Sequence, residues 1–299
     1  MTSPADKTQG ARAVSAEDPG TVFPAPQLVQ RIEAAERDGL AAIVASCGGA
    51  WATSLAGGAA LYRGTGSPFN KLVGLGFAPL TAAALDGVEQ RYAALGAPVQ
   101  VELATYADPA ITNLLITRGY QLTGYENVLG RSLSGTLPPS AAEIEVRLAR
   151  DDERAAWVDV LTEGFAARVE GEAAAAHDDF DRAALEGVFR DMSDKPTVAH
   201  WLAFIAGHTH VGGGASMGVS DGIAQLFGAA TRPSARRRGV QSALLAARLR
   251  SAQQQGCDLA VITTQPGSKS QHNAQRAGFS LLYARAIWLR EPVGASDQR

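Results

Sequence analysis

The stretch TRPSARRRGVQSALLAARL, Thr231–Leu249, contains three consecutive arginines, a glycine and then an apolar-faced segment that is typical of a helix. The residues before it, Ile223–Thr231, are typical of a strand. A strand, a basic turn and a helix in this order leave the first N–H groups of the helix without partners, and such groups bind phosphate. The stretch therefore predicts an anion-binding loop at Arg236–Ser242, with a solvated basic turn or a nucleic-acid patch as the alternatives.

Charge and composition narrow these alternatives. The formal net charge is −3, and 46% of the 299 residues are apolar, which is enough for a sizeable core. General nucleic-acid binding needs Lys and Arg spread over a wide footprint, so the acidic balance disfavours it. A local basic cluster in an acidic chain indicates a local anion.

Targeting signals and cysteine motifs are missing from the sequence. Residues 1–22 are polar and predict a disordered leader, and the absence of a signal-peptide pattern or a long apolar run predicts a cytoplasmic protein with no membrane contact. Cys47 and Cys257 lie far apart and lack metal-ligand spacing, so we expect both thiols to be reduced and no metal to be bound.

The chain contains an internal repeat. The Gly-aromatic pairs Gly119-Tyr120 and Gly278-Phe279 are 159 residues apart, and each follows a strand, a loop and a short helix. Upstream, Gly74 corresponds to Gly228 at a separation of 154 residues, so the second half has about five extra residues, which fall around the arginine cluster. The halves look like duplicated units of which only the second carries the arginine loop.

The repeat and a Ser/Gly/Pro-rich linker predict the domain organisation. We expect a first domain at residues 23–134, a linker near residues 134–142 and a second domain at residues 143–299. In the second half, antiparallel strands give way to a strand, helix, strand unit. The predicted fold class is α/β, with two similar domains that each contain a mixed, mostly antiparallel sheet flanked by helices.

The arginine loop resembles the acyl-CoA signature of the GNAT superfamily of N-acetyltransferases, whose core is Q/R-x-x-G-x-G/A. Arg236 takes the first position, Gly239 the central glycine and Gln241 the last, while "SQHNAQRAGF" (Ser270–Phe279) matches the later short helix that ends in Gly-Phe. Two departures are Arg237, where glycine is common, and Gln241, where Gly or Ala is usual. The resemblance covers residues 143–290, with the first half as a degenerate GNAT-like copy.

The resemblance implies acetyl-CoA as the cosubstrate. Backbone groups of residues 237–242 would hold the pyrophosphate, the end of the preceding strand would pair with the pantetheine amides, and an N–H near Ala230 or Thr231 would polarise the thioester carbonyl. The implied acetyl-CoA-binding residues are Ala229, Ala230, Thr231, Arg236, Arg237, Arg238, Gly239, Val240, Gln241, Ser242 and Asn273. The first half lacks the loop, so we expect it to bind no CoA.

Candidates for the catalytic acid and base are less distinctive. Many relatives have a tyrosine four residues before the glycine of Gly-Phe, where this chain has Ala274. Tyr283, on the following strand, is the nearest tyrosine and the candidate acid, although a strand aromatic also suits the core. Glu163, at the end of a helix, is a candidate base, and His208 and His210 at a hairpin turn are weaker candidates.

The acceptor is indicated by one acidic segment, which the resemblance places at the acceptor site. Acidic walls attract cations, so we expect a small cationic amine as the substrate, with an ordinary solvated surface as the alternative explanation. A protein N-acetyltransferase and a non-catalytic acyl-CoA sensor or scaffold remain open, and so does a homodimer. The acidic residues are Glu163, Glu170, Glu172, Asp178, Asp179 and Asp181.

Overall fold

The computed structural model describes residues 22–139, 143–167, 182–207 and 210–292. The predicted leader and most of the acidic segment lie outside this part of the chain. The first half contains α1 (Pro26–Ala45), β1 (Trp51–Leu55), β2 (Gly58–Tyr62), β3 (Lys71–Leu75), α2 (Ala82–Ala94), β4 (Val99–Ala104), α3 (Pro109–Thr117) and β5 (Gln121–Ser132).

The second half repeats this plan with two helices in the place of α1. It contains β6 (Ile144–Leu148), the short 3-10 turn η1 (Asp151–Glu153), α4 (Arg154–Ala166), α5 (Arg182–Ser193), β7 (Val198–Ile205), β8 (Val211–Ser220), β9 (Ile223–Thr231), the 3-10 turn η2 (Pro233–Ala235), α6 (Val240–Gln254), β10 (Leu259–Thr264), α7 (Lys269–Arg276) and β11 (Ser280–Arg290). The strand, helix, strand order predicted for both repeats is confirmed.

All the described strands belong to one mixed sheet of 11 strands, in the order β1-β2-β3-β4-β11-β5-β10-β9-β8-β7-β6. Neighbouring strands are antiparallel except for β3 with β4 and β9 with β10. The predicted mixed and mostly antiparallel α/β architecture is confirmed.

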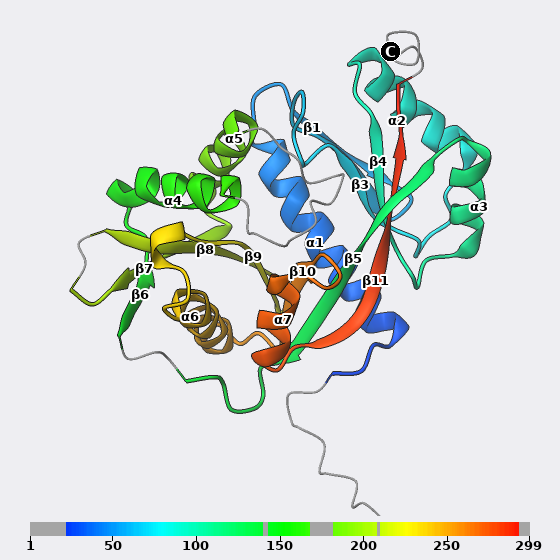
Figure 1. Ribbon diagram of the computed structural model, residues 1–299. Helices are drawn as coiled ribbons and strands as arrows, with labels where there is room; N and C mark the ends of the chain where they lie inside the picture. The colour runs from blue at the N-terminus through cyan, green and yellow to red at the C-terminus, as the bar shows by residue number, and fades with distance from the viewer. Residues whose placement is uncertain (1–21, 140–142, 168–181, 208–209, 293–299) are drawn as a thin grey trace, which may run out of the picture.

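The two halves exchange their last strands, which the sequence repeat does not predict. β11 of the second half lies between β4 and β5 of the first, and β5 lies between β11 and β10 (Figure 1). Each half therefore completes the sheet of the other. β11 pairs with β4 and β5 pairs with β10, so neither β4 nor β10 is an edge strand with unpaired N–H and C=O groups.

The sheet is covered on both faces. Alternate residues of β3 point to opposite sides, so that Leu72 packs against α2 and α3 whereas Val73 packs against α1. In the second half, Leu244 of α6 lies in the core on one face and Trp157 of α4 lies in the core on the other. The sheet thus forms the middle of three layers.

Helix α1 joins the halves. Its first turns, at Val29 and Ile32, pack against Ile223 of β9 and neighbouring residues of β10, whereas Val44 near its end packs on β2 and β3. On its surface, Nη1 of Arg31 donates to Oδ2 of Asp258 at 2.8 Å. The first helix of the chain therefore crosses the sheet from the second half to the first (Figure 1).

Two further sequence predictions concern cysteines and membranes. Cys47 and Cys257 are both free thiols, as expected. None of the helices in the described part of the chain has the length and apolar character needed to cross a bilayer.

Candidate active site

The arginine loop connects the end of β9 to the start of α6. Gly239 precedes the helix with a φ of 84°, in the left-handed region that glycine adopts without strain, and no side chain caps the helix. The N–H of Ala243 makes the first helical bond, to the Gly239 carbonyl at 3.0 Å. The preceding N–H groups of α6 have no partner within the helix, as a phosphate-binding terminus requires.

A second left-handed residue lies two positions earlier. Arg237 has a φ of 61°, which disfavours a residue with a Cβ by about 1–2 kcal/mol. This is the position at which the family signature commonly has glycine. Arg237, Arg238 and Gly239 are all exposed, so the backbone of the loop faces solvent.

Two other arginines attach the loop to the end of α4. Nη2 of Arg236 donates to the carbonyl of Ala167 at 2.9 Å, and Arg232 forms an ion pair with Glu163. On the other side of the loop, Oγ1 of Thr231 lies 3.3 Å from Oε1 of Gln241 and links the end of β9 to the first turn of α6. Gln241, which departs from the signature, thus closes the base of the loop.

Strands β9 and β10 separate before they reach the loop. Their parallel pairing runs from Ile223 opposite Leu259 to Gln225 opposite Val261 and stops there, although β9 continues to Thr231. Beyond that point β9 is paired only with β8. The N–H and C=O groups of Ala229–Thr231 that face β10 have no strand partner in the described sheet, and they are free to pair with an extended ligand.

A bulge lies within the separated part of β9. The pairing with β8 shifts from Ser216 opposite Phe227 to Gly214 opposite Ala230, which leaves one more residue on β9 than on β8. Gly228 lies in the bulge with a φ of 52°. Because bulges bend the bulged strand, Ala229–Thr231 turn away from β10.

The elements around the loop approach one another closely because they carry glycine. A Cβ on Gly164 of α4 would lie 2.6 Å from the Cβ of Ala230, and one on Gly213 of β8 would lie 2.6 Å from Cγ1 of Val240. Both distances are shorter than van der Waals contact. These glycines therefore allow α4 and the first turn of α6 to pack directly on the end of β9.

The comparisons agree with this geometry. Residues 154–279 match the model of the acetyltransferase (GNAT) family, over the segment that runs from α4 to the Gly-Phe element. This segment of the chain is therefore a GNAT domain.

Solved structures show the same fold across both halves. A GCN5-related N-acetyltransferase from Kribbella flavida superposes with a TM-score of 0.64 and 18% identity, over 89% of this chain and 96% of that chain. A tandem GNAT protein from the clavulanic acid biosynthesis pathway has a TM-score of 0.55 at 10% identity over 76% of each chain, and a GCN5-related N-acetyltransferase from Sphaerobacter thermophilus has 0.52 at 14% over 70% of this chain and 65% of that one. No curated protein matches the chain.

The first half of the chain, which lies outside the matched segment, is built differently at the corresponding place. The pairing of β3 with β4 extends to Leu75, the last residue of β3, and the N–H of Asp108 donates to the carbonyl of Gly76 at 3.1 Å. Helix α2 is capped, since Oγ1 of Thr81 accepts a bond from the N–H of Ala84. The first half thus has neither a comparable separation of strands nor an uncapped basic helix start.

The candidate acid Tyr283 lies in the core. It is 4% exposed, and its hydroxyl donates to Oε1 of Glu33 at 2.6 Å. Burial raises its pKa well above that of a free tyrosine, and the nearby Glu33 raises it further. These surroundings favour a structural role, which is the alternative noted for a strand aromatic.

The other candidates occupy separate places. Glu163 lies beside the loop in its ion pair with Arg232, so it is near the proposed cosubstrate site and already engaged. The side-chain oxygen of Asn273 accepts a bond from Arg276 at 2.5 Å on α7. His210 is exposed at the start of β8, and His208 lies outside the described residues.

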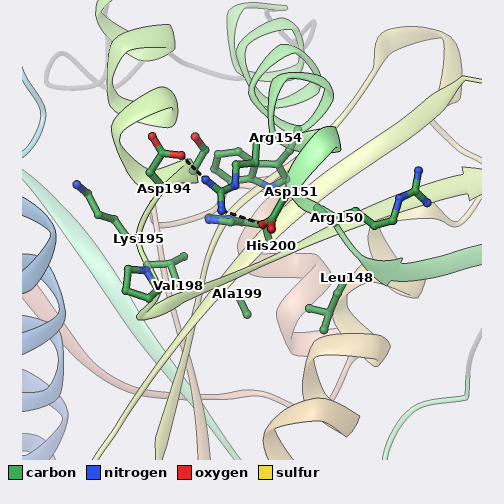
Figure 2. Close-up of a pocket in the computed structure, with 13 residues that line it drawn as sticks. Leu148, Arg150, Asp151, Arg154, Asp194, Lys195, Val198, Ala199 and His200 are labelled. Carbon is green, nitrogen blue, oxygen red and sulfur yellow. Dashed lines mark hydrogen bonds and ion pairs between the residues drawn. The ribbon is translucent and has the colours of Figure 1, made fainter.

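A cavity of about 310 Å³ lies at the opposite end of the GNAT sheet from the loop. It opens between the start of β7, the start of α4 and the end of α5, where Arg154 bridges Asp151 and Asp194 (Figure 2). Val198, in its wall, pairs with Gly218, five residues along β8 from the Gly213 that pairs with Thr231. At about 3.3 Å per residue the cavity is roughly 17 Å from the loop.

His200 lines this cavity and was not singled out from the sequence. Its Nε2 is 3.1 Å from the Met192 carbonyl, its ring packs against Trp157 in a tilted arrangement with the centroids 4.1 Å apart, and its Nδ1 is 3.4 Å from Oγ of Ser216. Burial lowers the pKa of His200 to about 4, so the imidazole is neutral at pH 7. His200 and Arg154, in the wall of the cavity, both have hydrogen-bond or ion-pair partners, which fits a structural role.

A buried charge cluster at the junction of the halves was also missed. Lys71 donates to Oε1 of Glu102 at 2.6 Å, and Arg285, only 1% exposed, donates to carboxylates of α1. Burial and the nearby Glu102 raise the pKa of Glu126 to about 8. Charged residues within otherwise apolar strands are the sequence signal that could have revealed this cluster. Its members are Glu33, Glu36, Lys71, Glu102, Glu126 and Arg285.

Proposed function

We propose that this protein is an N-acetyltransferase that transfers an acetyl group from acetyl-CoA to a primary amine, and that the second half carries the site. The observation that best supports this proposal is that two possible binding features lie next to each other in the chain. The unpaired edge of β9 at Ala229–Thr231 leads, through the loop, into the uncapped start of α6. An extended amide-containing arm that ends in a pyrophosphate matches both.

The chain's own groups account for binding. The first N–H groups of α6, at Val240–Ser242, would bind the pyrophosphate together with the positive end of the helix dipole. The exposed Arg237 and Arg238 add positive charge at the same place, and the exposed Gly239 leaves room for the ligand. The outward-facing edge of Ala229–Thr231 would pair with the pantetheine amides.

The same strand edge would assist the chemistry. The neutral amine nitrogen attacks the thioester carbonyl carbon, the C–S bond breaks, the nitrogen releases a proton to water, and CoA leaves as a thiolate that takes up a proton. An N–H of Ala230 or Thr231 would stabilise the oxyanion that develops on the carbonyl. Catalysis of this kind depends mainly on holding two reactants in place, which is compatible with a site that lacks a tyrosine at Ala274.

The acceptor that we propose is a small cationic amine. The support is the run of carboxylates that begins with Glu163 and continues in the part of the chain outside the described residues. Such a segment raises the local concentration of a cation. A non-catalytic acyl-CoA sensor is the second candidate, because Tyr283 is buried and Ala274 occupies the usual acid position.

Acetyl-CoA binding is tested by a matched pair of substitutions on α6. Gly239→Trp places a large side chain at the start of the helix, whereas Gly256→Trp introduces the same side chain after its end, where Gly256 has a similar φ of 77° and open space around it. We expect acetyl-CoA to raise the melting temperature of the wild type and of Gly256→Trp, but not of Gly239→Trp. An equal shift in all three proteins would contradict the proposed site.

Turnover is tested separately. The wild type and Gly239→Trp are incubated with acetyl-CoA and a library of amines, and mass spectrometry detects the gain of one acetyl group. Acetylation of cationic small molecules by the wild type alone supports the proposed reaction. Binding of acetyl-CoA with no product above background would identify the protein as a sensor, and acetylation of peptides only would identify a protein N-acetyltransferase.

A further inference from the structure

Arg248 of α6 is a buried cation under the bulge of β9. The residue is 2% exposed and lies on the apolar face of the helix, four residues after Leu244. Its Nη1 donates to the carbonyl of Ser216 at 3.0 Å and to that of Phe227 at 3.4 Å, and its Nε lies 3.3 Å from the carbonyl of Leu244. One guanidinium thus spans strands β8 and β9.

The surroundings of Arg248 differ from those of Arg285, the buried arginine of the charge cluster. Arg285 is surrounded by carboxylates, whereas no acidic side chain in the described part of the chain forms an ion pair with Arg248. Burial lowers the pKa of Arg248 to about 9, and the group keeps its charge at pH 7. A buried charge without a counter-ion is costly, so stability alone does not explain an arginine here.

The two carbonyls that Arg248 binds belong to the last regular pair before the bulge. Ser216 lies opposite Phe227, and the register shifts between this pair and the next one. On the other face of the sheet, Oγ of Ser216 would be 3.3 Å from a Cβ on Gly228, and it lies 3.4 Å from Nδ1 of His200. The strand pair that borders the bulge is therefore contacted on both faces, by His200 on one and by Arg248 on the α6 side.

We infer that Arg248 is a positioning residue for the acetyl-CoA site, which fixes the bulge at Gly228 and thereby directs the edge of Ala229–Thr231 away from β10. The inference rests on the proposed function, because that edge is the proposed partner of pantetheine and of the thioester carbonyl. Arg248 acts through the backbone and does not itself touch the cosubstrate. It would thereby fix the direction of the end of β9, which has no strand partner on its β10 side.

Three variants test this role. Arg248→Met removes the guanidinium and keeps an unbranched apolar side chain of similar length, Arg248→Lys keeps the charge with fewer donors, and Arg250→Met is the control on a half-buried arginine of the same helix. The readouts are the melting temperature, the Kd for acetyl-CoA by calorimetry, KM and kcat, and amide hydrogen exchange of the peptide Phe227–Thr231. The exchange measurement needs no cosubstrate.

We expect Arg248→Met to fold with an unchanged or higher melting temperature, since an apolar side chain replaces a lone buried charge. Its Kd and KM for acetyl-CoA should rise at least about tenfold, because a misplacement of about 1 Å can cost about a hundredfold. Exchange at Phe227–Thr231 should become faster, Arg248→Lys should recover part of the affinity, and Arg250→Met should resemble the wild type.

Three results for Arg248→Met would overturn the inference. The first is an unchanged Kd for acetyl-CoA, and the second is unchanged amide exchange at the bulge. The third is a lower melting temperature with a lower kcat and an unchanged KM, because this combination would indicate ordinary destabilisation. If the wild type binds no acetyl-CoA, the proposed function fails instead. Amide exchange then still decides whether Arg248 fixes the bulge.

Discussion

Arg285 of β11 lies directly opposite Glu126 of β5 in the antiparallel pairing of these strands, and Nη1 of Arg285 is 4.0 Å from Oε2 of Glu126. The two residues are 159 positions apart in sequence, the separation that also relates Gly119 to Gly278. The pair therefore marks the approximate two-fold axis of the repeat. At this axis the duplicated halves differ in charge, because one copy has an acid where the other has a base.

Arg285 should be essential for the stability of the junction. It is the cation shared by Glu33 and Glu36 of α1, and its loss would leave several buried carboxylates without compensation. Removing one partner of a buried ion pair typically costs 3–5 kcal/mol, so we expect Arg285→Met to lower the free energy of unfolding by about that amount in urea titrations. Arg190→Met, which removes an exposed pair with Glu186, should cost less than about 0.5 kcal/mol.

Glu126 should make stability depend on pH. Its pKa of about 8 exceeds the ordinary value of 4.5 because of burial and the carboxylate of Glu102, with Lys71 and Arg285 acting in the opposite direction. Between these two pH values the folded protein holds a proton that the unfolded chain releases, so stability falls as the pH rises through this window.

The neutral variant Glu126→Gln removes this dependence. We expect the wild type and Glu126→Gln to have similar stability at pH 5, and the variant to become more stable by on the order of 4 kcal/mol at pH 9, measured by urea unfolding at each pH. Parallel stability curves for the two proteins from pH 5 to pH 9 would show that Glu126 is ionised throughout. The activity need not be known for this test.

The local elements were predictable, whereas their partners were not. Periodicity placed the strand, turn and helix around Arg236–Ser242, and the aligned glycines Gly74 and Gly228 share a left-handed conformation in corresponding strands. The alternation of residues along β5 and β11 shows which side chains point to each face of the sheet. This alternation does not depend on which strand lies beside them, so it does not identify the neighbouring strand. The strand exchange therefore has no local signature.

The buried charges illustrate a second limit. Arg248 interrupts the apolar face of α6, and Glu102 and Arg285 interrupt apolar strands, so their positions were visible in the sequence. Their partners were not, since each contact joins elements far apart in the chain. Tyr283 could be recognised as a core aromatic or as an acid, and its burial and its hydrogen bond to Glu33 favour the first.

The left-handed conformation of Arg237 predicts which of two variants, glycine or alanine, is the more stable. Arg237→Gly and Arg237→Ala both remove the guanidinium and differ only in the Cβ at a φ of 61°. We expect the glycine variant to be the more stable by about 1 kcal/mol. Arg238 is not among the left-handed residues, so the order should reverse there, with Arg238→Ala the more stable by about 0.4–1 kcal/mol. The same order at both positions would show that Arg237 does not adopt this conformation.

Tyr283→Phe separates a catalytic hydroxyl from a structural one. The hydroxyl is buried and donates to Glu33, which also accepts from Nε of Arg285 at 2.7 Å. Removing the hydroxyl leaves part of a buried carboxylate unsatisfied, so we expect unfolding to become easier by about 1–3 kcal/mol. Because Tyr283 lies in the core cluster of α1 and not at the loop, kcat and its pH profile should remain those of the wild type at a temperature where both proteins are folded. A fall in kcat of about a hundredfold or more, with the loss of one limb of the pH profile, would restore Tyr283 as the acid.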